Sequence, residues 1–227
     1  MSVDRKSALL NARLASHRRK VEKAEAVVKE AISIGKNPYV AFSCGKDSAA
    51  MLHLVLKHAP DTVARIILWD ESKFIGDFDE VIDAWRARGA RIEVLRLSRT
   101  SLLDKVSDRW EQLQSQDNHD MFFVGLRASE SMARKNTLRR HGQLYLAASG
   151  LWRVCPLAWM TDMDIASIVE TNDLPVLRVY KDHGYSERTA TRVPREQVRG
   201  EFLSAIQERD PVRYLAFKRA FPELEGM

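Results

Sequence analysis

Residues 39–48 read Tyr-Val-Ala-Phe-Ser-Cys-Gly-Lys-Asp-Ser, and this stretch decides the fold. The apolar run at its start has the length and composition of a buried β-strand. The small residues Ser43, Cys44 and Gly45 break the run, and a helix pattern with apolar side chains on one face follows them. A strand that turns directly into a helix leaves backbone N–H groups unpaired at the helix N-terminus, where the helix dipole also favours negative charge. The stretch therefore predicts an anion site suited to phosphate.

Side chains of the same turn also suit a phosphate ligand. Lys46 adds a mobile cation, and Ser43 and Ser48 add hydroxyl donors. Asp47 is suited to capping the helix or to helping hold a magnesium ion. The turn is not a Walker A loop, because that motif needs four residues between its first glycine and its Gly-Lys pair.

Three separate motifs resemble one protein family. The turn itself is similar to the SGGKDS loop of the PP-loop ATP pyrophosphatases, also called adenine nucleotide alpha hydrolases, although Cys44 stands where that family usually has its first glycine. Residues 124–134 read Val-Gly-Leu-Arg-Ala-Ser-Glu-Ser-Met-Ala-Arg, and residues 152–165 read Trp-Arg-Val-Cys-Pro-Leu-Ala-Trp-Met-Thr-Asp-Met-Asp-Ile. They look like the G-x-R-x-x-E-S and P-L-x-x-W-T-x-x-D segments of the phosphoadenosine phosphosulfate (PAPS) reductase branch of that superfamily. The resemblance covers residues 38–190.

Strand-like and helix-like segments alternate along the chain. We expect strands at residues 39–43, 63–69, 91–97, 121–126 and 144–147. We expect helices at residues 7–34, 77–88, 101–115, 129–140 and 161–171 and in the tail at 196–220. Such alternation predicts a doubly wound, mostly parallel five-stranded α/β sheet with helices on both faces. The resemblance implies the same adenine nucleotide alpha hydrolase-like fold.

The chain length fits one compact domain built from three parts. We expect an N-terminal helix in residues 1–37, a nucleotide-binding α/β part in residues 38–177, and a basic loop with a helical tail in residues 178–227.

Candidate site residues follow the predicted strands. Ligands of a doubly wound sheet bind outside the C-terminal ends of its strands. Trp69 and Asp70 end the second predicted strand, and Gly125 and Arg127 end the fourth. The resemblance implies that residues 43–48 hold phosphates, that the strand end near Leu68 to Asp70 meets the adenine and ribose, and that Arg127 reaches phosphate. A plain core role for Trp69 remains open.

The resemblance implies ATP and Mg²⁺ as cofactors. PP-loop enzymes typically cleave ATP between the α and β phosphates, pass AMP to an acceptor and release pyrophosphate. Lys46 and Arg127 are then the candidate catalytic residues, because cations stabilise the developing charge. Asp47 and Asp70 are candidate Mg²⁺ ligands. A purely structural pairing of Arg127 with Glu130 or Asp120 remains open, since arginine pairs readily with carboxylates.

Cysteine usage argues against a reductase. The chain has two cysteines, Cys44 and Cys155. Sulfonucleotide reductases carry a redox cysteine near the C-terminus, whereas no cysteine follows Cys155, and a four-iron cluster takes four cysteine ligands. We expect Cys155 to be buried, and we expect Cys44, beside Lys46 at a helix N-terminus, to have a lowered thiol pKa. We therefore expect neither PAPS reduction nor an iron–sulfur cluster.

The chain carries a net charge of +5, and its cations concentrate in residues 127–153 and 178–199. Basic segments of this kind suit a nucleotide, another anionic substrate or a nucleic acid. We expect residues 178–199 to form an irregular, mobile lid in which Arg188, Arg192 and Arg195 contact an anionic substrate.

Three functions therefore remain open. The first is ATP-dependent adenylyl transfer. The second is nucleic-acid modification, of the tRNA thiolation or DNA phosphorothioation type, which the basic segments favour. The third is a nucleotide-binding module without turnover, which Cys44 in the phosphate loop favours.

Composition also bears on location and assembly. No apolar run approaches the length of a membrane span, and the first residues lack the apolar core of a secretory signal. We expect a cytoplasmic protein without a membrane partner, and a homo-oligomer remains open.

Overall fold

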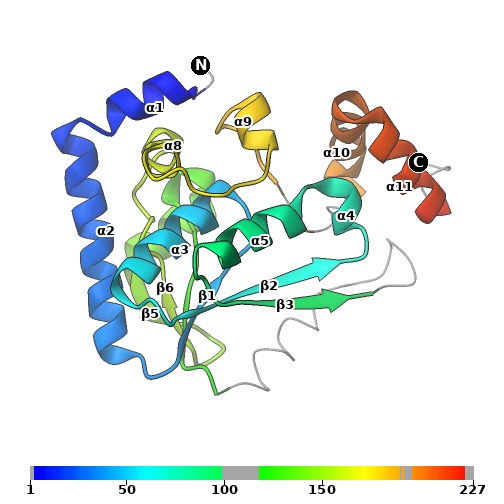
Figure 1. Cartoon of the computed structure of the whole chain (residues 1–227). Helices are drawn as coiled ribbons and strands as arrows, with labels where there is room; N and C mark the ends of the chain where they lie inside the picture. The colour runs from blue at the N-terminus through cyan, green and yellow to red at the C-terminus, as the bar shows by residue number, and fades with distance from the viewer. Residues whose placement is uncertain (1–2, 99–117, 190, 192–195, 223–227) are drawn as a thin grey trace.

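One six-stranded sheet organises the chain (Figure 1). The computed structural model describes residues 3–98, 118–189, 191 and 196–222. The strands lie in the order β3-β2-β1-β4-β6-β5, and every neighbouring pair is parallel except β5 with β6. Their bounds are β1 Pro38–Ala41, β2 Val63–Trp69, β3 Ile92–Leu97, β4 Met121–Phe123, β5 Leu144–Leu146 and β6 Trp152–Val154.

The strand order confirms the doubly wound α/β fold. From β1 the chain moves outward through β2 to β3, and β4 then lies against the other side of β1. The order therefore reverses between β1 and β4, which is where such folds bind ligands. The expectation of five strands is wrong, because β6 adds a sixth. This strand has three residues, too few to show an alternating pattern in the sequence.

Helices flank the sheet and connect its strands. In Figure 1, α3 and α5 lie over the same face of the sheet, and α2 and α8 pack beside α3. The helix expected at residues 101–115 lies outside the described residues. The helical bounds are α1 Arg5–Asn11, α2 Ala15–Ile34, α3 Lys46–His58, α4 Ser72–Ile75, α5 Phe78–Ala87, η1 Ala128–Glu130, α7 Met132–His141, α8 Asp162–Thr171, α9 Val179–His183, α10 Glu196–Arg209 and α11 Pro211–Ala220.

Two expected segments differ from the structure. The single helix expected at residues 7–34 is two helices, α1 and α2, because Leu14 is extended and acts as the N-cap of α2. Residues 178–199 are not irregular throughout, since they contain α9 and the start of α10. Tyr180 and Tyr185 are buried, so tertiary packing anchors the first part of this segment.

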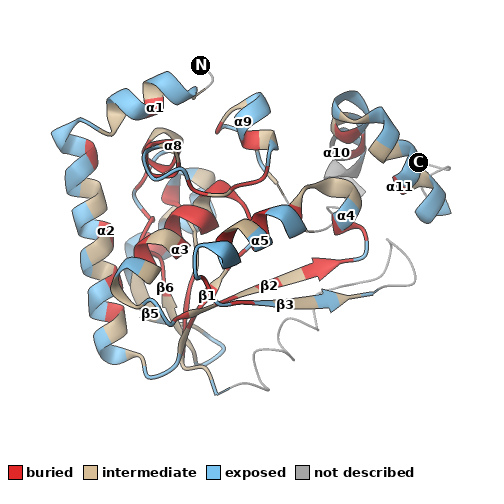
Figure 2. Ribbon diagram, in the orientation of Figure 1, coloured by how far each residue is buried: buried red, intermediate tan, exposed pale blue. Residues whose placement is uncertain are grey.

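Three clusters of buried side chains hold the described residues together. Ala128, Leu138, Cys155 and Ala158 form one of them, and the other two differ in size. The larger one joins the N-terminal helices, the sheet and the segment up to Tyr185. Buried residues accordingly concentrate on the strands and on α3 and α8, while α2 exposes much of its surface (Figure 2). The smaller cluster, Leu203, Phe217 and Phe221, joins α10 to α11 and packs against Phe74 of α4. Within the described residues, no helix combines the length and apolarity that crossing a bilayer requires.

Candidate nucleotide site

A cavity of about 780 Å³ opens at the point where the strand order reverses. The loop after β1 and the loop after β4 form two of its walls, and side chains from β2, β3, α8 and α9 complete it. Residues expected at the site that line it are Ser43, Gly45, Lys46, Asp47, Ser48, Trp69, Gly125, Arg127 and Arg188. The structure therefore brings together most of the candidates that the sequence spreads over nearly 150 positions.

Hydrogen bonds fix the turn between β1 and α3. The hydroxyls of Ser43 and Ser48 lie 3.1 Å apart, and the Ser48 hydroxyl donates to the Gly45 carbonyl at 2.9 Å. Gly45 permits a close approach, because a Cβ there would lie 3.2 Å from the Tyr180 hydroxyl and 3.4 Å from the Ser43 hydroxyl. The turn thus presents a helix N-terminus to the cavity with little side-chain cover.

Cys44 adopts the backbone conformation that glycine prefers. Its φ is +56°, in the left-handed region that is strained for a residue with a Cβ. Its side chain is fully buried and its Sγ lies 3.8 Å from the Phe78 carbonyl oxygen. The thiol therefore points into the core, and Cys44 is not among the residues that line the cavity.

Burial also changes the acidity of the thiols. Burial raises the pKa of Cys44 far above its ordinary value, and Asp77 and Asp79 add to the increase. The expectation of a lowered pKa for Cys44 is wrong, because desolvation outweighs the helix dipole and Lys46. Burial likewise raises the pKa of Cys155 to about 11, and Cys155 is fully buried as expected.

Gly125 brings the two walls of the cavity into contact. A Cβ at this position would lie 3.1 Å from the carbonyl carbon of Asp47 and 3.2 Å from its Cβ. Such contacts are tighter than most Cβ atoms make, so a side chain here would push the loop after β4 away from the start of α3 by a few tenths of an ångström.

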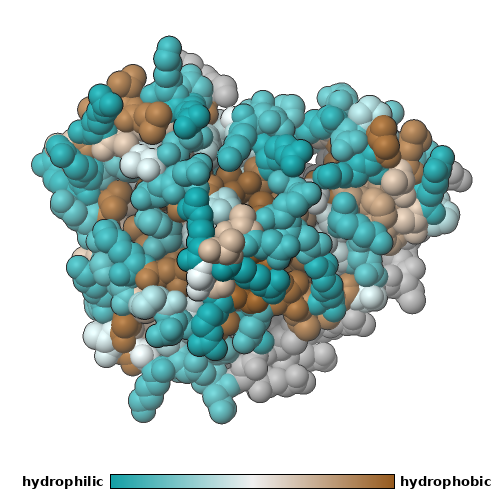
Figure 3. Space-filling view, in the orientation of Figure 1, coloured by the Kyte–Doolittle hydropathy of each residue, from teal (hydrophilic) through white to brown (hydrophobic). Residues whose placement is uncertain are grey.

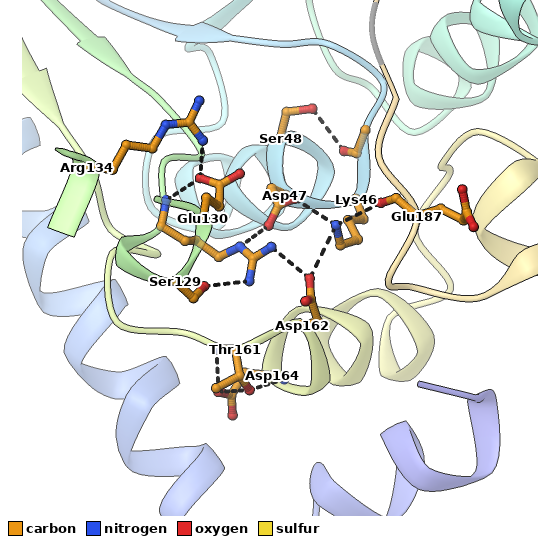
Figure 4. A network of polar contacts seen from close by, with 12 residues as sticks. Lys46, Asp47, Ser48, Ser129, Glu130, Arg134, Thr161, Asp162, Asp164 and Glu187 are labelled. Carbon is orange, nitrogen blue, oxygen red and sulfur yellow. Dashed lines mark hydrogen bonds and ion pairs between the residues drawn. The ribbon is translucent and has the colours of Figure 1, made fainter. Parts of the chain in front are cut away.

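Four charged side chains form a compact cluster in the cavity (Figure 4). The Lys46 ammonium lies 3.2 Å from an Asp47 oxygen and 3.4 Å from an Asp162 oxygen. The Arg127 guanidinium lies 2.5 Å from Asp47 and 2.7 Å from Asp162. Each cation therefore contacts both carboxylates, and the two loops are joined through α8.

Arg127 is the central cation of this cluster. Its side chain is only 4% exposed. Burial lowers its pKa, but Asp47 and Asp162 raise it more, so the net shift is upward and the guanidinium stays charged. Its Nε and the Asp47 Oδ1 form an ion pair without the alignment of a hydrogen bond, so both buried atoms keep hydrogen-bonding capacity. The alternative pairing is not seen at the side chain: Glu130 accepts from the Arg127 backbone N–H instead.

Asp162 is a site residue that the sequence analysis missed. It lies in the quoted segment 152–165, at the first position of α8, but the same helix turn also contains Asp164. Asp164 faces the opposite way and accepts hydrogen bonds from His17, Lys20 and Thr161. A spacing of two residues would have shown that the two carboxylates point in different directions, though not which one reaches the cavity.

Tyr180 and Thr189 were also missed. Their hydroxyls lie 2.7 Å apart on the cavity wall, and the Lys46 ammonium lies 5.4 Å from the centre of the Tyr180 ring. Burial raises the pKa of Tyr180 to about 12, so its hydroxyl is a neutral donor at pH 7. An aromatic residue at the start of a short helix gave no signal in the sequence that it would reach the phosphate loop.

Asp70, Arg192 and Arg195 are the remaining expected site residues. Asp70 is exposed, accepts a hydrogen bond from Ser98 at 3.3 Å, and does not line the cavity. Arg192 and Arg195 lie outside the described residues.

The cavity offers oxygen ligands for a metal ion. Asp47 keeps a buried oxygen without a hydrogen bond, and Asp162, whose side chain is 42% exposed, lies beside it. Carboxylates of this kind fit Mg²⁺, which takes one or two of them and completes its shell with water and substrate phosphates. Across the described ranges, no group of three or more His, Cys, Asp or Glu side chains is placed to hold a metal by itself.

Comparison with known sequences gives one family. The profile of the phosphoadenosine phosphosulfate reductase domain matches residues 37–187. This range contains the cavity walls as far as Ser186 and ends just before Arg188. A comparison with curated protein sequences gives no significant match.

The solved structures that resemble this chain include two kinds of enzyme. The FMN adenylyltransferase of Candida glabrata in complex with ATP is 14% identical with a TM-score of 0.56, over 78% of this chain and 65% of that one. The PAPS reductase of Candida auris in a phosphate complex is 14% identical with a TM-score of 0.53, over 69% and 83%. The chain thus spans slightly less than two thirds of the first enzyme. With sequence identities this low, the structural similarity establishes only that the fold is shared.

Proposed function

We propose that this chain, which belongs to the phosphoadenosine phosphosulfate reductase domain family, binds ATP at the switch-point cavity and transfers its adenylyl group to an acceptor. The observation that carries the proposal is the convergence of Lys46 and Arg127 on one cavity from the loops that follow β1 and β4. The similarity to FMN adenylyltransferases, one of them solved with ATP, supports adenylyl transfer as the reaction type.

The reaction balances without a redox partner. An acceptor oxygen attacks the α-phosphorus, a new P–O bond forms, and the bond to the bridging oxygen breaks. Pyrophosphate leaves with the electron pair of that bond. Lys46 and Arg127 stabilise the charge that develops on the phosphate oxygens, and the remaining catalysis is positioning.

Binding of nucleotide phosphates requires the carboxylates of the cluster to give up their ion pairs with Lys46 and Arg127. Asp47 and Asp162 neutralise Lys46 and Arg127 in the structure, so nucleotide phosphates compete with them for the same two cations. Mg²⁺ would neutralise phosphate charge in this cavity. Asp47 and Asp162 are the side chains that would hold it, and Asp162 takes the role we expected of Asp70.

Thiol chemistry has little support in this chain. Cys44 and Cys155 are both fully buried and their thiol pKa values are raised. Sulfonucleotide reduction needs a nucleophilic thiolate that forms a covalent sulfur intermediate. Membership of the family therefore does not lead us to propose reduction for this chain.

Calorimetry with ATP and Mg²⁺ tests the nucleotide site. Lys46→Ala should weaken binding by about 1.5–3 kcal/mol, because a charge-assisted contact is lost. Lys57→Ala is the matched control, since Lys57 lies on the same helix but is exposed and pairs with Glu25. Equal ATP affinity in the Lys46→Ala and Lys57→Ala variants would refute the proposal. Release of pyrophosphate, measured with candidate acceptors, then tests turnover.

Nucleic-acid modification is the second candidate, and α7 is the observation that favours it. This helix contains Arg134, Lys135, Arg139 and Arg140 and no acidic residue, and it follows the loop that carries Arg127. Trp159 is 47% exposed, and the neighbouring Ala158 carbonyl accepts from the Ala128 N–H at the start of η1. Cations beside an exposed aromatic ring suit a single-stranded nucleic acid.

Binding of labelled tRNA at several salt concentrations tests this second candidate. Replacing Arg139 and Arg140 by alanine should weaken binding and reduce its salt dependence, because two phosphate contacts are lost. Replacing Arg18 and Arg19, an exposed pair on α2, is the matched control. Equal effects of the two double substitutions would show non-specific attraction to a basic protein.

The third candidate, a module without turnover, loses its main support. That candidate depends on crowding of the phosphate loop by Cys44. The Cys44 side chain points into the core and leaves the cavity side of the loop free.

A further inference from the structure

A second cavity of about 740 Å³ lies between α4, α9 and α10. It adjoins the nucleotide cavity, because Arg188 and Thr189 line both. The surface is indented where α9 faces the pair α10 and α11 (Figure 3). Small-molecule sites typically measure about 300–1,000 Å³, so the second cavity has the size of a binding site.

Two contacts join α10 and α11 to the parts of the chain around this cavity, namely α4 and the segment after α9. Phe74 of α4 stacks on Phe217 of α11, with ring centres 5.3 Å apart. Arg209, the last residue of α10, pairs with Glu187 at 2.7 Å. The second cavity lies between these facing surfaces. A cavity of this size that opens to the surface beside a nucleotide cavity has the form of a ligand site.

Most of the surface that faces this gap is apolar, although charged side chains surround it. Ile206 is 8% exposed and Leu177 is 2% exposed, and both line the cavity. Phe74, Ile75 and Val179 extend the apolar lining. A ligand with a ring or another apolar body would bury this surface, at a gain proportional to the area removed from water.

Arg188 places an unpaired positive charge at one end of the second cavity. Two other arginines of its wall have partners, since Arg209 pairs with Glu187 and Arg213 pairs with Asp210. Arg178 lines the second cavity as well, but it does not line the nucleotide cavity. Arg188 has no ion-pair partner among the described residues, and it stands where the two cavities meet. An anionic group of the ligand would therefore lie at the end of the second cavity nearest the nucleotide.

We propose that the second cavity is the acceptor site and that it binds an organic anion with an apolar ring. Arg188 holds the anionic oxygens of this acceptor against the nucleotide cavity. The proposal rests on adenylyl transfer as the function of the first cavity. One anionic oxygen attacks the α-phosphorus of ATP, the α–β bridge breaks, and pyrophosphate leaves with the electron pair.

Two exposed carboxylates further restrict the chemistry of the acceptor. Asp182 and Glu201 line the same cavity, and their side-chain carboxylates have no hydrogen-bond or ion-pair partner among the described residues. They accept hydrogen bonds and repel a second anionic group. The acceptor therefore carries its charge at one end and hydrogen-bond donors on its body.

Binding of 1-naphthyl phosphate tests the site, because this fluorescent probe combines an apolar ring with one anionic group. Ala205→Trp fills the cavity from α10, and Ser204→Trp places the same side chain on the exposed side of that helix. We expect Ala205→Trp to weaken probe binding at least tenfold and Ser204→Trp to leave it unchanged. Calorimetry with ATP on all three proteins is read separately, so a failure of the nucleotide site is distinguished from a failure of the acceptor site.

The position of the anionic group is tested by phosphorus magnetic resonance. Paramagnetic Mn²⁺ added with ATP should broaden the probe's phosphorus signal in the ternary complex, because Arg188 places that phosphate beside the nucleotide cavity. Arg188→Ala should reduce affinity for 1-naphthyl phosphate and for 1-naphthoate, yet leave 1-naphthol binding unchanged. A probe that ATP displaces, equal binding by the Ala205→Trp protein, or a phosphorus signal that Mn²⁺ does not broaden overturns the proposal.

Discussion

The Arg127 guanidinium donates a hydrogen bond to the Asp162 carboxylate over 2.7 Å, and this contact joins the loop after β4 to the first residue of α8. Asp162 also lies 3.4 Å from the Lys46 ammonium. An aspartate of the protein thus interacts with both cations that we assign to phosphate. We therefore expect the negative charge of Asp162 to weaken the binding of an incoming anion to these two cations.

Asp162→Asn should raise the affinity for inorganic pyrophosphate in the absence of Mg²⁺. The Asp162 side chain is 42% exposed, so its competition with the ligand is that of a partly screened ion pair, and the gain should be about twofold to fivefold. Calorimetry in the presence of EDTA measures it. Asp173→Asn removes an exposed carboxylate that pairs with Arg88 and serves as the control.

Addition of Mg²⁺ should reverse the effect of Asp162→Asn. If Asp162 helps hold the ion, the variant binds Mg²⁺ with ATP more weakly than the unaltered protein does, because a carboxylate ligand is lost. A variant that binds pyrophosphate no better without Mg²⁺ and ATP no worse with it would show that Asp162 has neither role.

Sequence reasoning predicted that the loop at residues 43–48 and Arg127 lie together at the switch point, but it missed Asp162. The reason is the orientation of the Asp162 side chain. Loop residues follow from local rules, since a strand that meets a helix through small residues can be read along the chain. Which of two carboxylates at the start of α8 faces the cavity depends on how α8 packs against α2 and the sheet. That packing joins residues about 145 positions apart, as the contacts of His17 and Lys20 with Asp164 show.

The same distinction between local pattern and tertiary packing explains which parts of the fold could be predicted. Strand β2 occupies the predicted residues 63–69, because its apolar run is long enough to be read directly. Strand β6 and helix α9 are short, and they exist because their neighbours bury Val154 and Tyr180. Tertiary packing of this kind leaves no periodic pattern in so few residues.

Asp164→Asn should destabilise the protein and flatten its dependence on pH. Burial raises the pKa of Asp164, but hydrogen bonds from His17, Lys20 and Thr161 lower it far more, to well below its ordinary value. A carboxyl with a lowered folded-state pKa stabilises fully above its unfolded pKa, which is about 3.9. That stability is lost as the pH falls from there through the folded-state pKa. At neutral pH the substitution should cost about 1.5–3 kcal/mol.

Urea unfolding between pH 2 and pH 7 measures the effect of Asp164→Asn. The unaltered protein should lose stability on acidification more steeply than the variant does. Asp83→Asn is the control, because Asp83 is 74% exposed and forms only a surface pair with Arg86. Parallel curves for the unaltered protein and Asp164→Asn would show that the carboxylate charge does not stabilise the junction of α2 and α8.

Gly125→Ala should weaken both folding and ATP binding. The added Cβ would lie 3.1 Å from the Asp47 carbonyl carbon, so the loop after β4 and the start of α3 have to separate. Overpacking of this kind costs about 1–3 kcal/mol. Gly200→Ala provides the contrast, since a Cβ at Gly200 meets nothing within 4 Å and alanine favours a helix. Thermal unfolding with and without ATP separates the loss of stability from the loss of affinity.

Cys44 and Cys155 should be inert toward a disulfide reagent in the folded protein. Both thiols are buried, and burial raises their pKa values, that of Cys155 to about 11, so neither forms a thiolate at pH 8. Ellman's reagent should detect no thiol until guanidinium unfolds the chain, and then two. Ser16→Cys, at an exposed position of α2, should add one thiol that reacts at once.

Cys44→Gly should leave ATP affinity within about twofold of the unaltered value, because the Cys44 side chain faces the core rather than the cavity. Glycine relieves the left-handed backbone at φ +56°, a gain of roughly 1–2 kcal/mol. It also removes a buried side chain, a loss of similar size, so stability should change little. Rapid reaction of Cys44 in the folded protein, or a large change in ATP affinity in the Cys44→Gly variant, would mean that the thiol faces the nucleotide. Such a result would refute the argument against thiol chemistry in this chain, and assays of PAPS reduction would become the decisive experiment.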